Sequence, residues 1–125
     1  MTRFLIESYF YLIRIELLLR RGHLRRIHDL VRRYGTRPRT AKGALSAADL
    51  CRAMDIACVL YPKQVLCLQR SAAATLLLRS HGFRVEMVIG AQTLPFKSHA
   101  WVELDNTVIT DKPYMHDIYQ VLERC

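Results

Sequence analysis

The sequence predicts an α+β domain in which helices come first and an antiparallel sheet follows. Up to about residue 81 the apolar residues recur at helical spacing, and both a capping signal and a helix-ending glycine are present. After Gly82 the pattern changes to the alternation that is typical of strands, with turn residues between the alternating segments. An order in which helices come first and strands joined by short turns come next is characteristic of α+β folds.

The segment 3–33 is predicted to form two helices, or one helix interrupted near Gly22. It contains no proline, and its apolar residues recur at helical spacing. Residues 34–43 hold two glycines, a proline and basic side chains, which is the composition of a loop. We therefore expect a basic helical arm with its loop over residues 1–45 and a core over residues 46–125, together forming one compact domain.

Two further helices and three strands are expected in the core. Ser46 and Asp49 form a capping box at the start of a helix that Pro62 ends, and an Ala- and Leu-rich helix runs from about Val65 to His81. The alternating segments 83–89 and 99–104 predict two strands, and the turn residues that follow precede a third, short strand over residues 108–110. The expected sheet is therefore an antiparallel meander.

The charge of the chain is strongly positive and is concentrated near its start. Lys and Arg number 19 against 11 Asp and Glu, and ten of the arginines lie in the first 39 residues beside three acidic residues. Such a surface suits nucleic acid, anionic lipid or an acidic protein, and it equally suits a solvated helical face. Since no nucleic-acid-binding motif accompanies it, we expect no nucleic acid as a ligand.

Several other classes of protein are disfavoured. Glu7, Arg14 and Glu16 interrupt the longest apolar stretch, so neither a transmembrane segment nor a signal peptide is predicted. The four cysteines form no Cys-x-x-Cys pair and have no Cys/His ligand spacing, so we expect no disulfide framework, no metal and no cofactor. A cytoplasmic protein is the expectation.

Three residues in the core are candidates for a catalytic site. Cys67 falls two or three residues into a predicted helix, where unpaired N–H groups and the helix dipole favour a thiolate. His99 at a strand start would be its base, and Asp111 after the next strand would orient the imidazole. Each has an ordinary alternative, because buried cysteines are commonly inert, strand histidines are often polar edge residues, and an aspartate before Lys-Pro suits a turn.

The hairpin between His99 and Asp111 tests whether they can meet. In an antiparallel pair, the numbers of two residues that lie opposite each other always add to the same sum. His99 and Asp111 have an even sum, so they can share a face only if the residues paired across this hairpin also have an even sum. A two-residue turn at positions 105 and 106 would pair Leu104 with Thr107 and put Asp111 on the wrong face. We therefore expect a three-residue loop or a bulge, with Asn106 in the left-handed conformation.

Residues 67–111, with Cys-Leu-Gln-Arg-Ser at 67–71, His-Ala-Trp-Val-Glu at 99–103 and Asp111, resemble the transglutaminase-like lasso-peptide leader peptidases. The resemblance implies a transglutaminase-like, papain-like core and a cysteine protease with Cys67 as nucleophile, His99 as base and Asp111 as orienting acid. Arg70 and Ser71 belong to the same motif and would either hold the helix or contact substrate. Trp101 would wall the site against water or fill the core.

The oxyanion of the reaction needs hydrogen-bond donors, for which the backbone N–H of Cys67 and the side chain of Gln64 are the candidates. Gln64 is as well suited to an exposed loop. The implied partners are a lasso-peptide precursor, a separate leader-recognition protein, since 125 residues leave no room for a fused one, and the lasso cyclase. Two alternatives stay open: a transglutaminase-type acyl transferase, and a basic binding module without catalysis.

Overall fold

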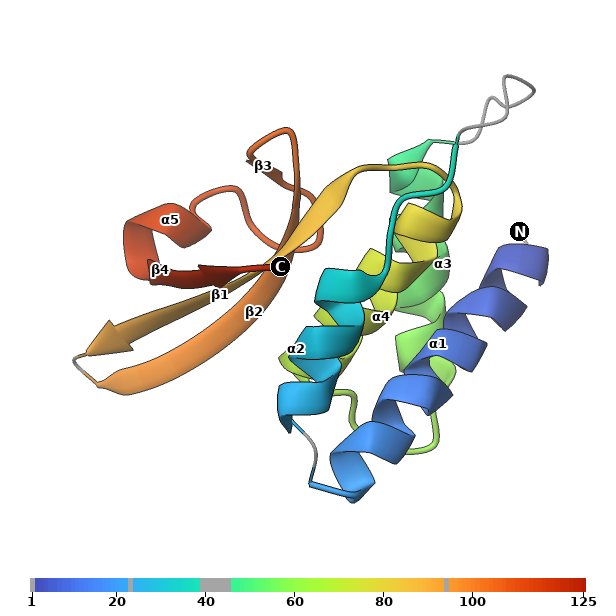
Figure 1. Cartoon of the computed structure of the whole chain (residues 1–125), viewed down its shortest axis with the longest axis horizontal. Coiled ribbons are helices and arrows are strands. Elements are labelled where there is room, and N and C mark those ends of the chain that lie inside the picture. The colour runs from blue at the N-terminus through green and yellow to red at the C-terminus, as the bar shows by residue number, and fades with distance from the viewer. Residues whose placement is uncertain (1, 23, 39–45, 94) are drawn as a thin grey trace.

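The computed structural model describes residues 2–22, 24–38, 46–93 and 95–125. The elements in chain order are α1 (Thr2–Arg20), α2 (Leu24–Arg33), α3 (Ala47–Leu60), α4 (Cys67–Ser80), β1 (Val85–Thr93), β2 (Phe96–Leu104), β3 (Thr107–Val108), α5 (Met115–Ile118) and β4 (Gln120–Arg124). Figure 1 shows the four long helices gathered on one side and the strands with α5 on the other. The predicted α+β class and its helices-first order are confirmed.

The ends of the helices follow local signals in the sequence. Gly22, at a φ of +70°, separates α1 from α2 at the predicted interruption. The capping box of α3 is present: the Asp49 N–H donates to Ser46 Oγ at 3.1 Å, and the Ser46 N–H donates to Asp49 Oδ2 at 3.3 Å. Residues 34–38 carry no regular structure, whereas the rest of the predicted loop and the proposed boundary after residue 45 lie outside the described residues.

Helix α4 begins two residues later than predicted. Leu66 is its N-cap and has an extended backbone, so Cys67 is its first residue rather than its second or third. The helix ends at Ser80, and Gly82 adopts a φ of +89° just after it, as a glycine at a helix end commonly does. The thiol of Cys67 therefore lies at the extreme N-terminus of α4.

The sheet has the strand order β3-β2-β1-β4, and every neighbouring pair is antiparallel. Strands β1 to β3 form the predicted meander. Neither β4 nor α5 was predicted; β4 is a short strand that returns to the free edge of β1, with a register shift between Ile89 and Gly90. The residues of β1 with which it pairs lie about 30 positions or more away in the sequence, so the local sequence carries only a weak signal for this strand.

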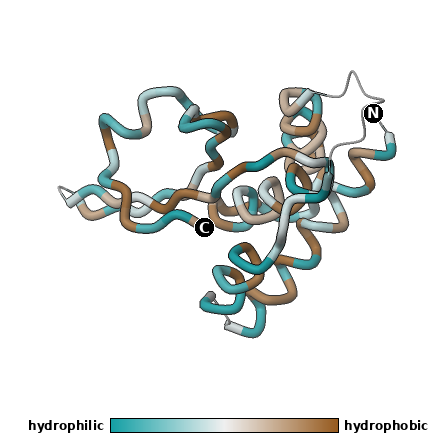
Figure 2. The backbone as a smooth tube through the Cα atoms, turned by 45° about the horizontal axis from the view of Figure 1, so that its top comes forward, coloured by the Kyte–Doolittle hydropathy of each residue, from teal (hydrophilic) through white to brown (hydrophobic). Residues whose placement is uncertain are grey.

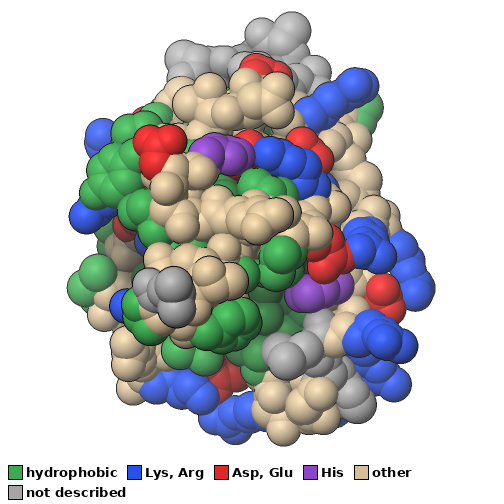
Figure 3. All heavy atoms as spheres, turned by 90° about the vertical axis from the view of Figure 1, so that its left-hand side faces the viewer, with side chains coloured by type: hydrophobic (Ala, Val, Ile, Leu, Met, Phe, Trp, Pro, Cys, Tyr) green, Lys and Arg blue, Asp and Glu red, His purple; other side chains and the backbone are tan. Residues whose placement is uncertain are grey.

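One hydrophobic core joins both halves of the chain. Helices α1 and α2 contribute Leu12, Ile15, Ile27 and Val31, all fully buried, and these pack with α3, α4 and one face of the sheet. Figure 2 shows the hydrophobic stretches of the helices turned toward one another. The opposite face of the sheet is covered by α5 and the adjoining segments, which enclose a smaller cluster of Val88, Trp101 and Met115. The central parts of β1 and β2 are thus buried on both faces, whereas the tip of their hairpin carries exposed residues such as Phe96. Figure 3, which views the molecule from that side, shows hydrophobic side chains at its surface.

Candidate active site

Cys67 and His99, the predicted nucleophile and base, line the same cleft. The cleft has a volume of about 150 Å³ and lies where the start of α4 meets the middle of β1 and β2. Its other lining residues come from four different elements and are His28, Leu68, Ile89, Ser98 and Ala100. The structure therefore brings a thiol at a helix N-terminus and an imidazole on a strand, 32 positions apart in the sequence, to one surface.

The ring of His99 is held from two sides. His99 Nε2 lies 2.5 Å from Asp111 Oδ2, and the ring stacks on Tyr119 with centroids 5.5 Å apart and planes 27° apart. Burial raises the pKa of Asp111, but the hydrogen bonds from His99 and from the Lys112 N–H outweigh it and leave that pKa below its ordinary value. Asp111 is therefore an anion over most of the pH range and a strong acceptor for His99.

The prediction of a three-residue loop or a bulge between β2 and β3 is wrong. Leu104 pairs with Thr107 across a two-residue turn, in which Asp105 (φ +52°) and Asn106 (φ +63°) are both left-handed. Asp111 still reaches His99, because β3 ends at Val108 and the chain leaves the ladder after one more bond, from the Ile109 N–H to the Val102 carbonyl. The parity rule applies only while strands stay paired, and it does not govern residues beyond the last pair.

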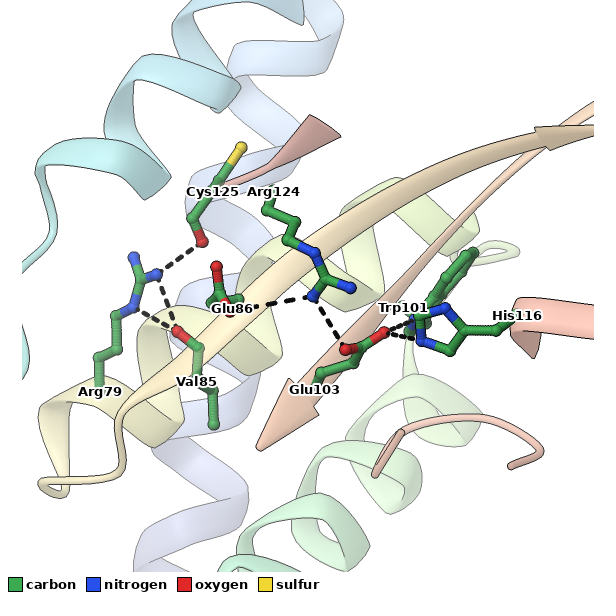
Figure 4. Close-up of polar contacts among 8 residues, drawn as sticks. All are labelled: Arg79, Val85, Glu86, Trp101, Glu103, His116, Arg124 and Cys125. Atoms are coloured by element: carbon green, nitrogen blue, oxygen red, sulfur yellow. Dashed lines mark hydrogen bonds and ion pairs between the residues drawn. The ribbon is translucent and has the colours of Figure 1, made fainter. Parts of the chain in front are cut away.

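Trp101 is fully buried beside His99, with ring centroids 6.2 Å apart. Its indole Nε1 donates to Glu103 Oε2 at 2.7 Å, and the same buried carboxylate accepts from His116 of α5 at 2.6 Å and from Arg124 of β4 at 2.9 Å (Figure 4). Burial raises the pKa of Glu103, but these donors outweigh it and lower the pKa below its ordinary value. Glu103 therefore ties α5 and β4 to the strand that carries His99.

Gly90 of β1 is the residue directly opposite His99 in the β1–β2 pair. An added Cβ there would lie 2.7 Å from Trp101 Cη2 and 2.8 Å from the Cβ of Tyr119, which is closer than real Cβ contacts. Because Gly90 has no side chain, Trp101 and Tyr119, whose rings flank His99, can pack directly against β1. The sequence analysis ended the predicted strand at residue 89, so it did not identify Gly90 as a glycine within a strand, which would have signalled such a close approach.

The cleft of Cys67 and His99 is not lined by the other predicted site residues, Gln64, Arg70 and Ser71. Gln64 is exposed in the loop before α4 and lines a different cleft, together with Glu16 and Lys63. The Arg70 side chain forms an ion pair with Asp55 of α3, and Ser71 is buried within α4. The ion pair of Arg70 thus links α4 to α3, while the choice between a structural role and a substrate contact stays open for Arg70 and Ser71; Gln64 lies outside the cleft of Cys67.

Two residues at the site were missed from the sequence. Tyr119, between α5 and β4, stacks on His99, and His28 of α2 lines the cleft. His28 Nδ1 lies 3.4 Å from Glu123 Oε2, and burial, with the nearby Arg32, lowers its pKa, so this imidazole is neutral near pH 7. The sequence around His28, an arginine-rich helix, did not indicate a site residue, because the approach of α2 to the cleft depends on tertiary packing.

The remaining cysteines differ from Cys67 in their surroundings. Cys51 and Cys58 lie within α3 and pack against the core. Burial raises the pKa of the Cys51 thiol to about 11 and also raises that of Cys58. Over the part of the chain that the structure describes, no group of three or more histidine, cysteine or acidic side chains is placed to hold a metal ion, and no helix has both the length and the apolarity of a bilayer span.

Two comparisons with known proteins found similar sequences. The family model described as Transglutaminase-like superfamily matches residues 10–124. The Microcin J25-processing protein McjB of Escherichia coli is 43% identical over 56 residues, which make up 45% of this chain and 27% of that relative. The match therefore spans about a quarter of the length of the relative. No solved structure matches significantly.

Proposed function

This chain belongs to the transglutaminase-like superfamily, and we propose that it is a cysteine peptidase that removes the leader from a ribosomally made lasso-peptide precursor. One observation carries the proposal: Cys67, at the first position of α4, shares a cleft with His99, which is hydrogen-bonded to Asp111. The resemblance to lasso-peptide leader peptidases and the likeness to the Microcin J25-processing protein support a peptide substrate.

In this proposal Cys67 is the nucleophile and His99 its base. The free N–H groups of the first turn of α4 stabilise a thiolate. Because Asp111 engages Nε2 of His99, Nδ1 is the nitrogen that takes the thiol proton. Asp111, anionic through its lowered pKa, would stabilise the imidazolium that results.

The reaction then proceeds in two halves. The thiolate sulfur attacks the scissile carbonyl carbon, and the C–N bond breaks as His99 gives its proton to the departing amine. Water attacks the thioester that remains while His99 accepts its proton, which releases the carboxylic acid and frees the sulfur. The Cys67 N–H is the proposed donor to the oxyanion; for Gln64 to assist, the loop before α4 would have to move.

Mass spectrometry of the precursor peptide after incubation with the protein tests the function. Cleavage should yield two fragments whose summed mass exceeds that of the precursor by one water, and Cys67→Ala should yield none, whereas Cys58→Ala should cleave normally. Repeating the reaction with a simple primary amine distinguishes the transglutaminase-type alternative, which would pass the acyl group mainly to the amine although water is in large excess, whereas a peptidase would give mainly the carboxylic acid. A basic binding module would bind in a strongly salt-dependent way, leave the precursor intact and be indifferent to Cys67→Ala.

A separate leader-recognition protein is the proposed partner, with the lasso cyclase acting on the product. Such a partner would tether the leader and raise the local concentration of the scissile bond at Cys67. Its addition should lower the precursor concentration that gives half-maximal rate and should change the rate at saturation far less. Equal rates on dilute precursor with and without the partner would argue against the split arrangement.

A further inference from the structure

We propose that the groove between α1 and α2 is an exosite that binds an acidic, partly apolar segment of the same peptide that is cleaved at Cys67. The groove has a volume of about 510 Å³, with Leu17, Leu18 and Leu30 among its lining residues. The proposal rests on the peptidase function proposed above and adds to it the chemistry of a second substrate contact.

Four guanidinium groups line this groove together with one acid. Arg14 comes from α1 and Arg21 directly follows its last residue, Arg26 and Arg33 come from α2, and Asp29 is the acidic residue. Among the residues that the structure describes, none of the four arginines forms an ion pair, although Arg32 on the same helix pairs with Glu123. Uncompensated positive charge around a concave leucine surface is complementary to carboxylates that flank apolar side chains.

The apolar surface continues from the groove along α1. Ile6, Phe10 and Ile13 are 65%, 60% and 44% exposed, and Leu17 in the groove is 52% exposed. Their spacing of four, three and four residues forms one stripe on a helix, which a surface helix of a globular protein normally buries. The stripe therefore extends the surface on which a peptide with apolar side chains would lie.

Helix α2 connects this groove with the cleft of Cys67, because it presents a different face to each. Ile27 and Val31 are fully buried in the core, His28 lines the cleft, and Arg26, Leu30 and Arg33 line the groove. At 100° per residue these three sets fall on three separate sides of the helix. Figure 1 shows α2 lying between α1 and the β1–β2 hairpin, so the groove and the cleft are one helix apart.

The thickness of α2 sets the spacing between the two sites on one peptide. A helix with its side chains is about 10–12 Å across, and an extended chain advances about 3.3 Å per residue. A peptide leaving the cleft would cross α2 in roughly four residues. The acidic segment is therefore expected at least about four residues from the scissile bond, where it would hold the substrate without touching the reacting atoms.

Binding to the Cys67→Ala protein tests the exosite independently of cleavage. The probe is a short fluorescein-labelled peptide of Leu and Glu, compared by anisotropy with the same peptide carrying Lys in place of Glu. We expect the acidic probe to bind more tightly, and Arg26→Glu/Arg33→Glu to weaken its binding at least about fivefold. The matched control reverses two exposed arginines elsewhere, Arg52→Glu/Arg84→Glu. Leu17→Ser should also weaken binding, whereas Val59→Ser, at an exposed apolar residue of α3, should not.

Cleavage kinetics then test whether the occupant is the substrate. With wild-type Cys67, Arg26→Glu/Arg33→Glu should raise KM for the precursor about fivefold and leave kcat within about twofold, because the groove does not touch the reacting atoms. Replacing the acidic residues of the precursor by their amides should raise KM for the wild type and have little effect on the double variant.

Three results would overturn the exosite. The first is acidic-probe binding within twofold of wild type in Arg26→Glu/Arg33→Glu. The second is weakened probe binding with unchanged KM, which would assign the groove to a partner protein. The third is binding of the protein to phosphatidylglycerol vesicles that the Arg52→Glu/Arg84→Glu control retains and Arg26→Glu/Arg33→Glu loses, while KM of Arg26→Glu/Arg33→Glu stays at the wild-type value. That result would assign the groove to a membrane surface. Absence of all cleavage alongside intact probe binding would instead refute the peptidase function.

Discussion

His99 and Asp111 meet across a hairpin whose register would separate them if its ladder continued. The two side chains are 2.5 Å apart, although Leu104 pairs with Thr107. The strand β3 ends at Val108, and after it Thr110 Oγ1 accepts from the Val102 N–H at 2.9 Å. This side-chain bond anchors the departing chain against β2 and brings Asp111 beside His99. The contact therefore depends on how β3 ends.

Loss of the proposed nucleophile or base should reduce cleavage more than loss of the orienting acid. Cys67→Ala and His99→Ala remove the nucleophile and the base, so both should abolish detectable leader cleavage. Asp111→Asn keeps the shape of the orienting residue without its charge and should lower kcat roughly a hundredfold or more. Rates are to be measured by mass spectrometry on saturating precursor. Full cleavage by Cys67→Ala would refute the assignment of the nucleophile.

Alkylation should distinguish Cys67 from the cysteines of α3. Iodoacetamide reacts with the thiolate, and burial keeps Cys51 and Cys58 protonated at neutral pH. Peptide mapping after brief treatment near pH 7 should find Cys67 modified first, and His99→Ala should slow that modification. Faster labelling of Cys51 than of Cys67 would show that the start of α4 does not activate a thiol.

A methyl group at Gly90 should damage both stability and activity. Gly90→Ala would push against Trp101 and Tyr119, and overpacking of this kind typically costs about 1–3 kcal/mol of folding free energy. Because those rings flank His99, the cleavage rate of the folded variant should fall as well. Gly35→Ala is the control, since an added Cβ there meets nothing within 4 Å. Equal denaturation midpoints for the two variants would contradict the close packing.

The buried carboxylate of Glu103 should stabilise the fold in a pH-dependent way. Its pKa is lowered in the folded protein from an ordinary value of 4.5, so its contribution is complete above about pH 4.5 and is lost as the pH falls through the lower folded value. Glu103→Ala removes the acceptor of Trp101, His116 and Arg124 and should cost about 3–5 kcal/mol at pH 7. Urea unfolding at pH 7 and pH 3 measures both effects, and the variant should show a smaller difference between the two pH values than the wild type.

Local patterns were enough to predict most of the helices and the first two strands. The capping box at Ser46, the glycines at positions 22 and 82 and the change from helical to alternating periodicity all act within a few residues. The start of α4 was misplaced by two residues, because Val65 and Leu66 continue the apolar composition without being helical. The strand β4 was missed because its pairing with β1 depends on a distant edge.

The order of helices and strands follows from spacing and motifs along the chain, and so does the choice of Cys67, His99 and Asp111 as candidates. The surroundings of these residues depend instead on tertiary packing. Tertiary packing stacks Tyr119 on His99, brings His28 to the cleft and leaves Gln64 outside it. It also buries the carboxylate of Glu103, which accepts a hydrogen bond from Arg124 of β4. The physical reason is that each of these contacts joins elements far apart in the chain, so each exists only once the core shared by α1, α2, α4 and the sheet has formed.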